Sequence, residues 1–276
     1  MKAALVQMSS SDDPATNLAE ASVMIRDAVA RGAEFVLTPE ITNCVSGSRE
    51  HQRKVLATEE LDPVLAGLRA LAADLKIWLL IGSLGVKSGE ADGRFANRSL
   101  LIAPDGSVKA RYDKIHMFDV DLGPGEKFTE SEAYRPGAQA VVAETPLGNI
   151  GLSICYDVRF GALYRRLAQA GAQIITVPAA FAVTTGRAHW EVLLRARAIE
   201  TGSYVLAPAQ CGSHRSSTGH RRDTWGHSLA ISPWGEVLAD GGTEPGVTLI
   251  DLDLAEVARA RSRVPSLTHD REFKLP

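Results

Sequence analysis

The strongest constraint on the fold is a series of short apolar segments rich in Val, Ile and Leu. They are "KAALVQ" (2–7), "EFVLTPE" (34–40), "IWLLIGSL" (77–84), "NIGLSICYD" (149–157) and "AQIITVPAA" (172–180). Such uninterrupted apolar runs are typical of strands that are covered on both faces. The segments therefore predict an α/β fold in which helices cover the sheets.

Helical patterns separate these strands. The first begins near Pro14, carries its apolar residues on one face and stops before Gly32, and a second runs from Pro63 to Leu75. In the second half, "FGALYRRLAQAG" (160–171) and "GRAHWEVLLRARAIETG" (186–202) are also typical of helices that end at glycine. No low-complexity linker interrupts the chain, so we expect one domain over residues 1–276, with mixed sheets layered against each other.

A hairpin is expected at "GHSLAISPWGEVLAD" (226–240). Pro233 and Gly235 suit the second and fourth positions of a type I turn between two strands.

Composition excludes several classes of function. The chain of 276 residues has a net charge of -3, with Lys and Arg mixed among Asp and Glu, which gives no basic stripe for nucleic acid and no polybasic membrane anchor. No apolar run is long enough to cross a bilayer, and "MKAALVQMSS" lacks a signal-peptide core. Three scattered cysteines do not make a disulfide framework. We therefore expect a cytoplasmic protein whose partner is a small molecule or another protein chain.

Three residues at the ends of expected strands could form one site. Cys155 ends an apolar strand just before a helix expected from Arg159 or Phe160, where the helix N-terminus favours a thiolate. Glu40 ends another apolar strand, and Lys114 follows the expected strand "GSVKARYD" (106–113). Taken singly, each has an ordinary explanation: a small buried thiol, a surface carboxylate and a solvated ammonium group.

Together, however, the three groups can supply the base, the nucleophile and the oxyanion stabiliser of one reaction. Glu40 can accept the thiol proton, and Cys155 can then act as the nucleophile. Lys114 can stabilise the oxyanion of a tetrahedral intermediate together with the backbone N–H of Tyr156. The set therefore favours an enzyme over a scaffold that merely retains the fold.

In these motifs the chain resembles the nitrilase superfamily of carbon-nitrogen hydrolases. "LTPE" with Glu40, "YDKIHMFD" with Lys114 and "SICYDVRF" with Cys155 stand in the order of that family. The resemblance implies an α-β-β-α sandwich and assigns the roles of base, oxyanion partner and nucleophile to Glu40, Lys114 and Cys155. It also implies a second glutamate, which "FTESE" matches at Glu130, with Glu132 as the alternative.

Within the superfamily, residues 178–214 and 225–240 are most similar to the Nit branch. "AQCGSH" (209–214) favours the deaminated glutathione amidases over the ω-amidases of that branch. The resemblance implies hydrolysis of an amide of a small 2-oxo acid through a thioester. An ω-amide, an N-carbamoyl compound or an aliphatic amide remain alternatives. No cofactor and no metal are implied, and a homodimer or homotetramer is expected, with the tail from about residue 255 contacting a partner subunit.

Several residues are candidates for holding the acid group of the substrate. Arg159 could bind a carboxylate with two hydrogen bonds, or it could form a structural ion pair with Asp157. Thr184 and Thr185 are candidates for hydroxyl contacts at the rim. The loop "CGSHRSSTGHRRD" (211–223) could close over an acidic substrate with Arg215, Arg221 and Arg222, or it could simply be solvated.

Two other kinds of site are alternatives. Cys211, His214 and His220 contain zinc-ligand chemistry but with irregular spacing. A cysteine protease would need one of the histidines, such as His116 or His189, to serve Cys155, and the papain-like sequence around the cysteine is missing.

Overall fold

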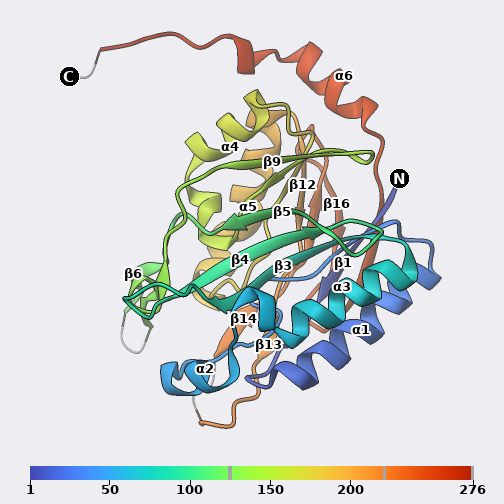
Figure 1. Ribbon diagram of the computed structural model, residues 1–276. Helices are drawn as coiled ribbons and strands as arrows, with labels where there is room; N and C mark the ends of the chain where they lie inside the picture. The colour runs from blue at the N-terminus through green and yellow to red at the C-terminus, as the bar shows by residue number, and fades with distance from the viewer. Residues whose placement is uncertain (124–125, 220–221, 275–276) are drawn as a thin grey trace.

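The computed structural model describes residues 1–123, 126–219 and 222–274. Its core consists of two mixed sheets with helices on their outer faces (Figure 1). The α/β prediction and the α-β-β-α arrangement are confirmed.

The first sheet has seven strands, β17 (Gly246–Asp251), β1 (Lys2–Gln7), β2 (Phe35–Leu37), β3 (Trp78–Lys87), β4 (Phe95–Ile102) and β5 (Val108–Asp113) in that order, and β8 (Tyr134–Arg135) beside β4. The second has six, in the order β16 (Val237–Asp240), β15 (Leu229–Ile231), β12 (Tyr204–Ala207), β11 (Ile174–Thr176), β10 (Gly148–Leu152) and β9 (Val141–Thr145). Two short hairpins join β6 (Asp119–Asp121) to β7 (Lys127–Thr129), and β13 (Cys211–Ser213) to β14 (Asp223–Trp225).

The helices are α1 (Pro14–Ala30), α2 (Arg49–Val55), α3 (Pro63–Leu75), α4 (Gly161–Gln169), α5 (Val183–Thr201) and α6 (Ala255–Arg263). Short 3-10 turns are η1 (Glu59–Leu61), η2 (Glu130–Glu132), η3 (Cys155–Arg159) and η4 (Ser266–Thr268). In Figure 1, α1 and α3 lie together on the outside of the first sheet. Near the end of the chain, α6 packs against the body through the buried Val257, and Asp270 beyond η4 pairs with Arg165 on α4.

Alternation along the strands explains the layers. In β1, Ala3 and Leu5 pack in the cluster between the two sheets, whereas Ala4 and Val6 pack in the cluster beneath α1 and α3. Both faces of the strand are therefore buried, as the uninterrupted apolar runs indicate.

The two halves of the chain repeat one topology. Strands β1, β2 and β3 are parallel neighbours joined through α1 and α3, and β10, β11 and β12 are parallel neighbours joined through α4 and α5. Each set is flanked by antiparallel strands. Parallel strands bring their carboxyl ends to one edge of their sheet. Glu40 follows β2 at this edge of the first sheet, and Cys155 follows β10 at this edge of the second.

Local sequence signals account for most element ends. Asp13 caps α1 by accepting hydrogen bonds from the N–H groups of Ala15 and Thr16, and α5 ends at Gly202 in the left-handed conformation. The expected turn is formed, because the Gly235 N–H donates to the Ser232 carbonyl between β15 and β16.

Two expected boundaries shift. The helix after Cys155 begins at Gly161 rather than at Arg159 or Phe160, because the 3-10 turn η3 intervenes. The helix expected from residue 186 starts earlier, at Val183, so that Thr184 and Thr185 lie in the first turn of α5.

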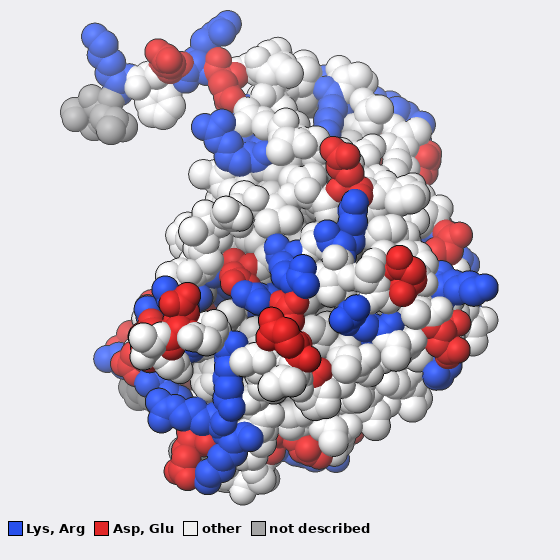
Figure 2. Space-filling model, in the orientation of Figure 1, with Lys and Arg blue, Asp and Glu red and all other residues white. Residues whose placement is uncertain are grey.

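The surface carries both signs of charge. On the face in Figure 2, Lys and Arg lie among Asp and Glu rather than in a single basic stripe. None of the described helices is long and apolar enough to cross a bilayer.

Candidate active site

The loop that carries Glu40 lies directly against β3. At Gly82, a Cβ atom would lie 2.0 Å from the Thr38 carbonyl oxygen and 2.6 Å from the Cβ of Pro178. Only glycine permits this approach, since real Cβ contacts are not so short. Gly82 therefore lets the loops that follow β2 and β11 meet at the seam between the two sheets.

Two residues of this region have strained backbones. Ile41, directly after Glu40, has φ 46°, and Cys155 has φ 50°. A branched residue in the left-handed region costs about 1–2 kcal/mol, so neighbouring contacts must hold it. The Ser83 hydroxyl accepts from the Ile41 N–H at 2.7 Å, and the Cys155 N–H donates to the Pro178 carbonyl at 2.9 Å.

Lys114 joins two carboxylates in the interior. It follows β5, and its Nζ lies 3.0 Å from Oε1 of Glu40 and 2.8 Å from Oε2 of Glu130. Only 2% of the lysine side chain is exposed. Because an unpaired ammonium group is very unfavourable in such a place, the two carboxylates are required for its burial.

Further donors fix the two carboxylates. The Asn97 amide nitrogen donates to Glu40 at 2.9 Å and to Glu130 at 3.3 Å. The Ala180 N–H donates to Oε2 of Glu40 at 2.7 Å, and the Phe118 N–H donates to Glu130 at 2.7 Å. Sequence reasoning missed Asn97, since a lone asparagine within a strand carries no signal without the structure.

The charges of this cluster set the protonation states. Burial alone would raise the pKa of Glu40, but Lys114 and Arg222 and the hydrogen bonds from Lys114 and Cys155 bring it below its ordinary value. Burial would lower the pKa of Lys114, but Glu130 and Glu40 hold it well above its usual range.

Burial and the charge of Glu40 raise the pKa of the Cys155 thiol well above its ordinary value, although Lys114 opposes them. The resting site therefore holds a neutral thiol and an ionised carboxylate that influence each other's pKa. This is the arrangement in which Glu40 can act as a general base for Cys155.

A cavity of about 340 Å³ reaches this cluster. Its lining includes Glu40, Asn97 and Glu130 from the cluster, and Phe128 and Arg222 on other sides. It is large enough for a small organic substrate.

Asp157 fastens the turn that presents Cys155. Its carboxylate is fully buried and accepts from the Ile154 N–H at 2.9 Å and the Tyr112 hydroxyl at 2.6 Å. It also accepts from the N–H of His116 at 3.0 Å and contacts the ring Nδ1 of His116 at 2.7 Å. Asp157 thus ties the strained turn at Cys155 to the segment just after Lys114.

Other candidate residues are placed as follows. Glu130 contacts Lys114, whereas Glu132 is exposed and pairs with Arg49 at 2.8 Å. The hydroxyl of Thr184 donates to Glu126 at 2.8 Å, and Thr185 is buried with its hydroxyl 3.4 Å from the Ala182 carbonyl.

Arg159 is partly exposed. The structural alternative predicted an ion pair between Arg159 and Asp157, and this pair is not formed. Its guanidinium lies 3.3 Å from Nδ1 of His189 and over the rings of Tyr156 and Phe181. Within the described residues it forms no ion pair. The carboxylate of Asp157 is instead used by other groups, so the guanidinium of Arg159 is left at the edge of the site.

The three loop arginines separate into different environments. Arg215 pairs with Glu20 on α1 and is exposed, and Arg221 lies outside the described residues. Arg222 lines the cavity and donates from Nη2 to the Ala180 carbonyl at 2.9 Å.

The alternative sites are not supported. Both ring nitrogens of His214 are engaged, with Ser10 and Thr224, and His220 lies outside the described residues. No cluster of three possible metal ligands occurs in the described ranges. The rings of His116 and His189 contact Asp157 and Arg159, and the charged neighbours of Cys155 are Glu40 and Lys114.

Comparison with known proteins places the chain in a family. The carbon-nitrogen hydrolase family matches residues 2–262. The chain is 40% identical to a deaminated glutathione amidase of Synechocystis sp., over 97% of each chain. It is 36% identical to the human omega-amidase NIT2, over 97% of this chain and 94% of that protein.

A solved structure of an amidase from Nesterenkonia sp. AN1 shows Michael addition of acrylamide at the active site cysteine. It superposes with a TM-score of 0.77 at 28% identity, over 96% of this chain and 98% of that one.

Replacing Asp157 tests how the nucleophile turn is held. Asp157→Asn places an NH₂ group among hydrogen-bond donors, so we expect the free energy of unfolding to fall by roughly 3 kcal/mol. Urea denaturation measures this. The control Asp74→Asn removes an exposed pair with Arg26 and should change stability by less than about 0.5 kcal/mol. Equal stability of the two variants would contradict the role of Asp157.

Proposed function

We propose that this chain, which belongs to the carbon-nitrogen hydrolase family, is an amidase that uses Cys155 as its nucleophile. The observation that carries the proposal is the buried Lys114, hydrogen-bonded to Glu40 and Glu130, together with the buried thiol of Cys155, whose pKa is raised by burial and by the charge of Glu40. A binding protein or scaffold would gain nothing from burying these charges around a cysteine, because buried ion pairs contribute little net stability.

The reaction follows from this arrangement. As the Sγ of Cys155 attacks the amide carbon, Glu40 takes the thiol proton. The negative charge on the carbonyl oxygen is stabilised by Lys114 and the N–H of Tyr156. The proton on Glu40 then passes to the departing nitrogen, so that the C–N bond breaks and a thioester remains.

Water completes the cycle. Glu40 takes a proton from a water molecule that attacks the thioester, the carboxylic acid leaves, and Cys155 recovers its proton. Glu130 orients Lys114 throughout, and it lines the cavity where the departing amine is released.

The proposed substrate is an amide of a small 2-oxo acid, of the deaminated glutathione type. The Synechocystis relative carries that activity in its name. The guanidinium of Arg159 forms no ion pair with a described carboxylate, so it can bind the carboxylate of a substrate. An ω-amidase acting on 2-oxoglutaramate or 2-oxosuccinamate is the second candidate, favoured by the similarity to the human omega-amidase. Other amides, including N-carbamoyl compounds, remain further alternatives.

We also propose that residues 1–276 form one domain that assembles as a homodimer or homotetramer. α5 exposes the apolar side chains of Val192 and Ile199, and Phe273 is exposed in the tail beyond α6. These are surfaces that a second copy would cover. A cytoplasmic location suits the mechanism, because a catalytic thiol needs a reducing compartment, and the three cysteines are free.

The nucleophile is tested by replacing Cys155. Cys155→Ala and Cys155→Ser remove the group that forms the thioester, so we expect amide hydrolysis to fall by about a thousandfold or more while the fold survives. Ammonia or amine release from deaminated glutathione and 2-oxoglutaramate measures this, and circular dichroism checks folding. Activity retained by either variant would exclude Cys155 as nucleophile, and preference between the two substrates separates the candidate functions.

Substrate charge is tested at Arg159. Arg159→Lys keeps the positive charge but loses the planar fork, so we expect a larger loss of kcat/KM with acidic amides than with neutral ones. The two substrate classes should be compared with one enzyme preparation. Equal losses on both would indicate that Arg159 only supports the structure.

Assembly is tested by light scattering of the purified chain. We expect a mass at least twice that of the 29.6 kDa chain, and a lower mass after Val192→Asp, which places a charge on the exposed face of α5. A monomeric wild-type protein would refute the assembly.

A further inference from the structure

The buried cluster of catalytic charges is not neutral by itself. Glu40 and Glu130 carry two negative charges, and Lys114 between them carries one positive charge. Cys155 adds none while its thiol is protonated. A net negative charge in a buried place favours protonation of a carboxylate, which would abolish a general base.

Arg222 is placed to supply the missing positive charge. Its Nη2 donates to the Ala180 carbonyl at 2.9 Å, and the N–H of the same Ala180 donates to Oε2 of Glu40 at 2.7 Å. Arg222 and Glu40 also line the same cavity. One guanidinium thus acts on Glu40 in two ways: by its charge, and by holding the residue that orients the carboxylate.

Other cationic groups at this cavity are engaged or exposed. Arg49 pairs with Glu132, and Lys127 is exposed on β7. Arg222 forms no ion pair with any described residue. Its charge instead lowers the pKa of Glu40.

The backbone of Arg222 is held from two sides. Its carbonyl accepts from the N–H of His214 at 2.9 Å, which extends the pairing of β13 with β14. The His214 ring is fixed between the Ser10 carbonyl and the Thr224 hydroxyl, both at 2.8 Å. Burial lowers the pKa of His214 to about 4, so the ring is neutral and its contacts persist near neutral pH.

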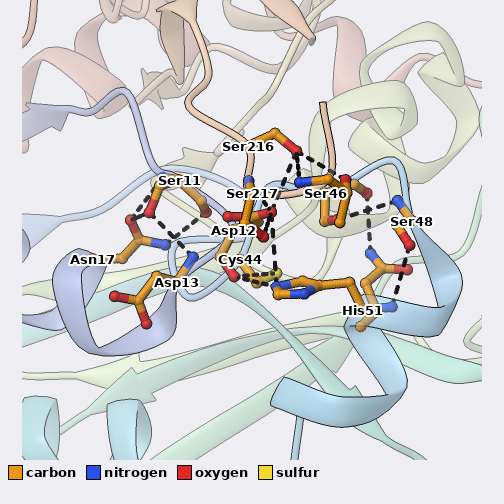
Figure 3. A network of polar contacts seen from close by, with 12 residues as sticks. Ser11, Asp12, Asp13, Asn17, Cys44, Ser46, Ser48, His51, Ser216 and Ser217 are labelled. Atoms are coloured by element: carbon orange, nitrogen blue, oxygen red, sulfur yellow. Dashed lines mark hydrogen bonds and ion pairs between the residues drawn. The ribbon is translucent and has the colours of Figure 1, made fainter. Parts of the chain in front are cut away.

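Asp12 anchors the rest of this loop. Its carboxylate accepts from the N–H and the hydroxyl of Ser217, both at 2.8 Å, and from the hydroxyl of Ser216 at 3.3 Å (Figure 3). On the other side, the ring of His51 lies 2.8 Å from the Asp12 carbonyl. The loop before Arg222 is therefore tied to the segments that follow β1 and Glu40.

We propose that Arg222 is a positioning residue for the general base: it balances the charge of the cluster and fixes Ala180, so that Glu40 stays ionised beside a neutral Cys155. The proposal rests on the proposed amidase function, because it assigns Glu40 the role of base. It also separates Arg222 from Arg215, which belongs to the same loop but faces Glu20.

The consequence is a change in pH dependence. The titratable and charged groups that face Glu40 are Lys114, Cys155 and Arg222, with Glu130 beyond Lys114. Arg222 also influences the pKa of Tyr134 and of His214. The other charged groups that line its cavity are Glu130, Glu132, Arg49 and Lys127. Removing the charge of Arg222 raises the pKa of Glu40. Only ionised Glu40 can accept the thiol proton. As the pH is lowered, Cys155 of the variant therefore loses its reactivity at a higher pH than Cys155 of the wild type.

The first readout is alkylation of Cys155 by iodoacetamide across pH, followed by mass spectrometry, because it requires no substrate turnover. We expect the acid limb of Cys155 alkylation to move to higher pH in Arg222→Gln, so that the rate at about pH 5, relative to the plateau, falls roughly tenfold. Arg222→Lys keeps the positive charge, so its acid limb should lie closer to that of the wild type than the acid limb of Arg222→Gln does. The matched control Arg215→Gln should keep the wild-type profile.

The second readout is kcat/KM for a neutral and an acidic amide over the same pH range. We expect the same shift of the acid limb for both substrates in Arg222→Gln. A wild-type acid limb in folded Arg222→Gln would overturn the proposal. So would a loss confined to the KM of the acidic amide, since that would make Arg222 a substrate-binding residue.

Failure of the amidase function gives a different result. It would show as wild-type protein that hydrolyses no amide and whose Cys155 is alkylated no faster than Cys44 and Cys211. If Cys155 is activated but the pH profile of its alkylation is the same in Arg222→Gln as in the wild type, only the role of Arg222 is refuted.

Discussion

The interaction on which the site depends is the buried contact of Lys114 with Glu40 and Glu130. It joins the ends of β2 and β5 and the turn η2, three segments that are distant in the sequence. Its net contribution to stability is small, because desolvation of the charges offsets their attraction. Removing one partner would leave an unpaired charge in the interior and lower the stability of the protein by about 3–5 kcal/mol. The pairing therefore fixes one geometry rather than a range of them.

This geometry requires backbone strain on both sides of the seam. Ile41 and Cys155 have positive φ angles, although neither is glycine. The contacts that hold them come from other parts of the chain: Ser83 for Ile41, and Pro178 and the Asp157 network for Cys155. Strain of this kind persists only where the surrounding structure determines the conformation, as it does here.

Sequence reasoning found the residues that end strands, and missed those whose role arises from tertiary contact. Glu40 and Cys155 end apolar runs, and Lys114 follows a strand, so their positions in the chain indicated a shared edge. Asn97 lies within β4 and Gly82 within β3, and their roles depend on which loops approach them. The helix start was misjudged because η3, which carries the strained Cys155, has no distinct composition.

The two-sheet architecture divides the chemistry between the halves of the chain. Glu40 and Lys114 follow strands of the first sheet, whereas Cys155 and Ala180 follow strands of the second. The distance between Glu40 and Cys155, the proposed base and nucleophile, is therefore set by the packing of Leu5, Leu37 and other side chains between the sheets. Because close-packed interiors transmit small displacements, a change of volume in that layer alters the site even where the protein remains folded. The large core of the sandwich thus positions the proposed site, since no single sheet holds both partners of the proposed proton transfer.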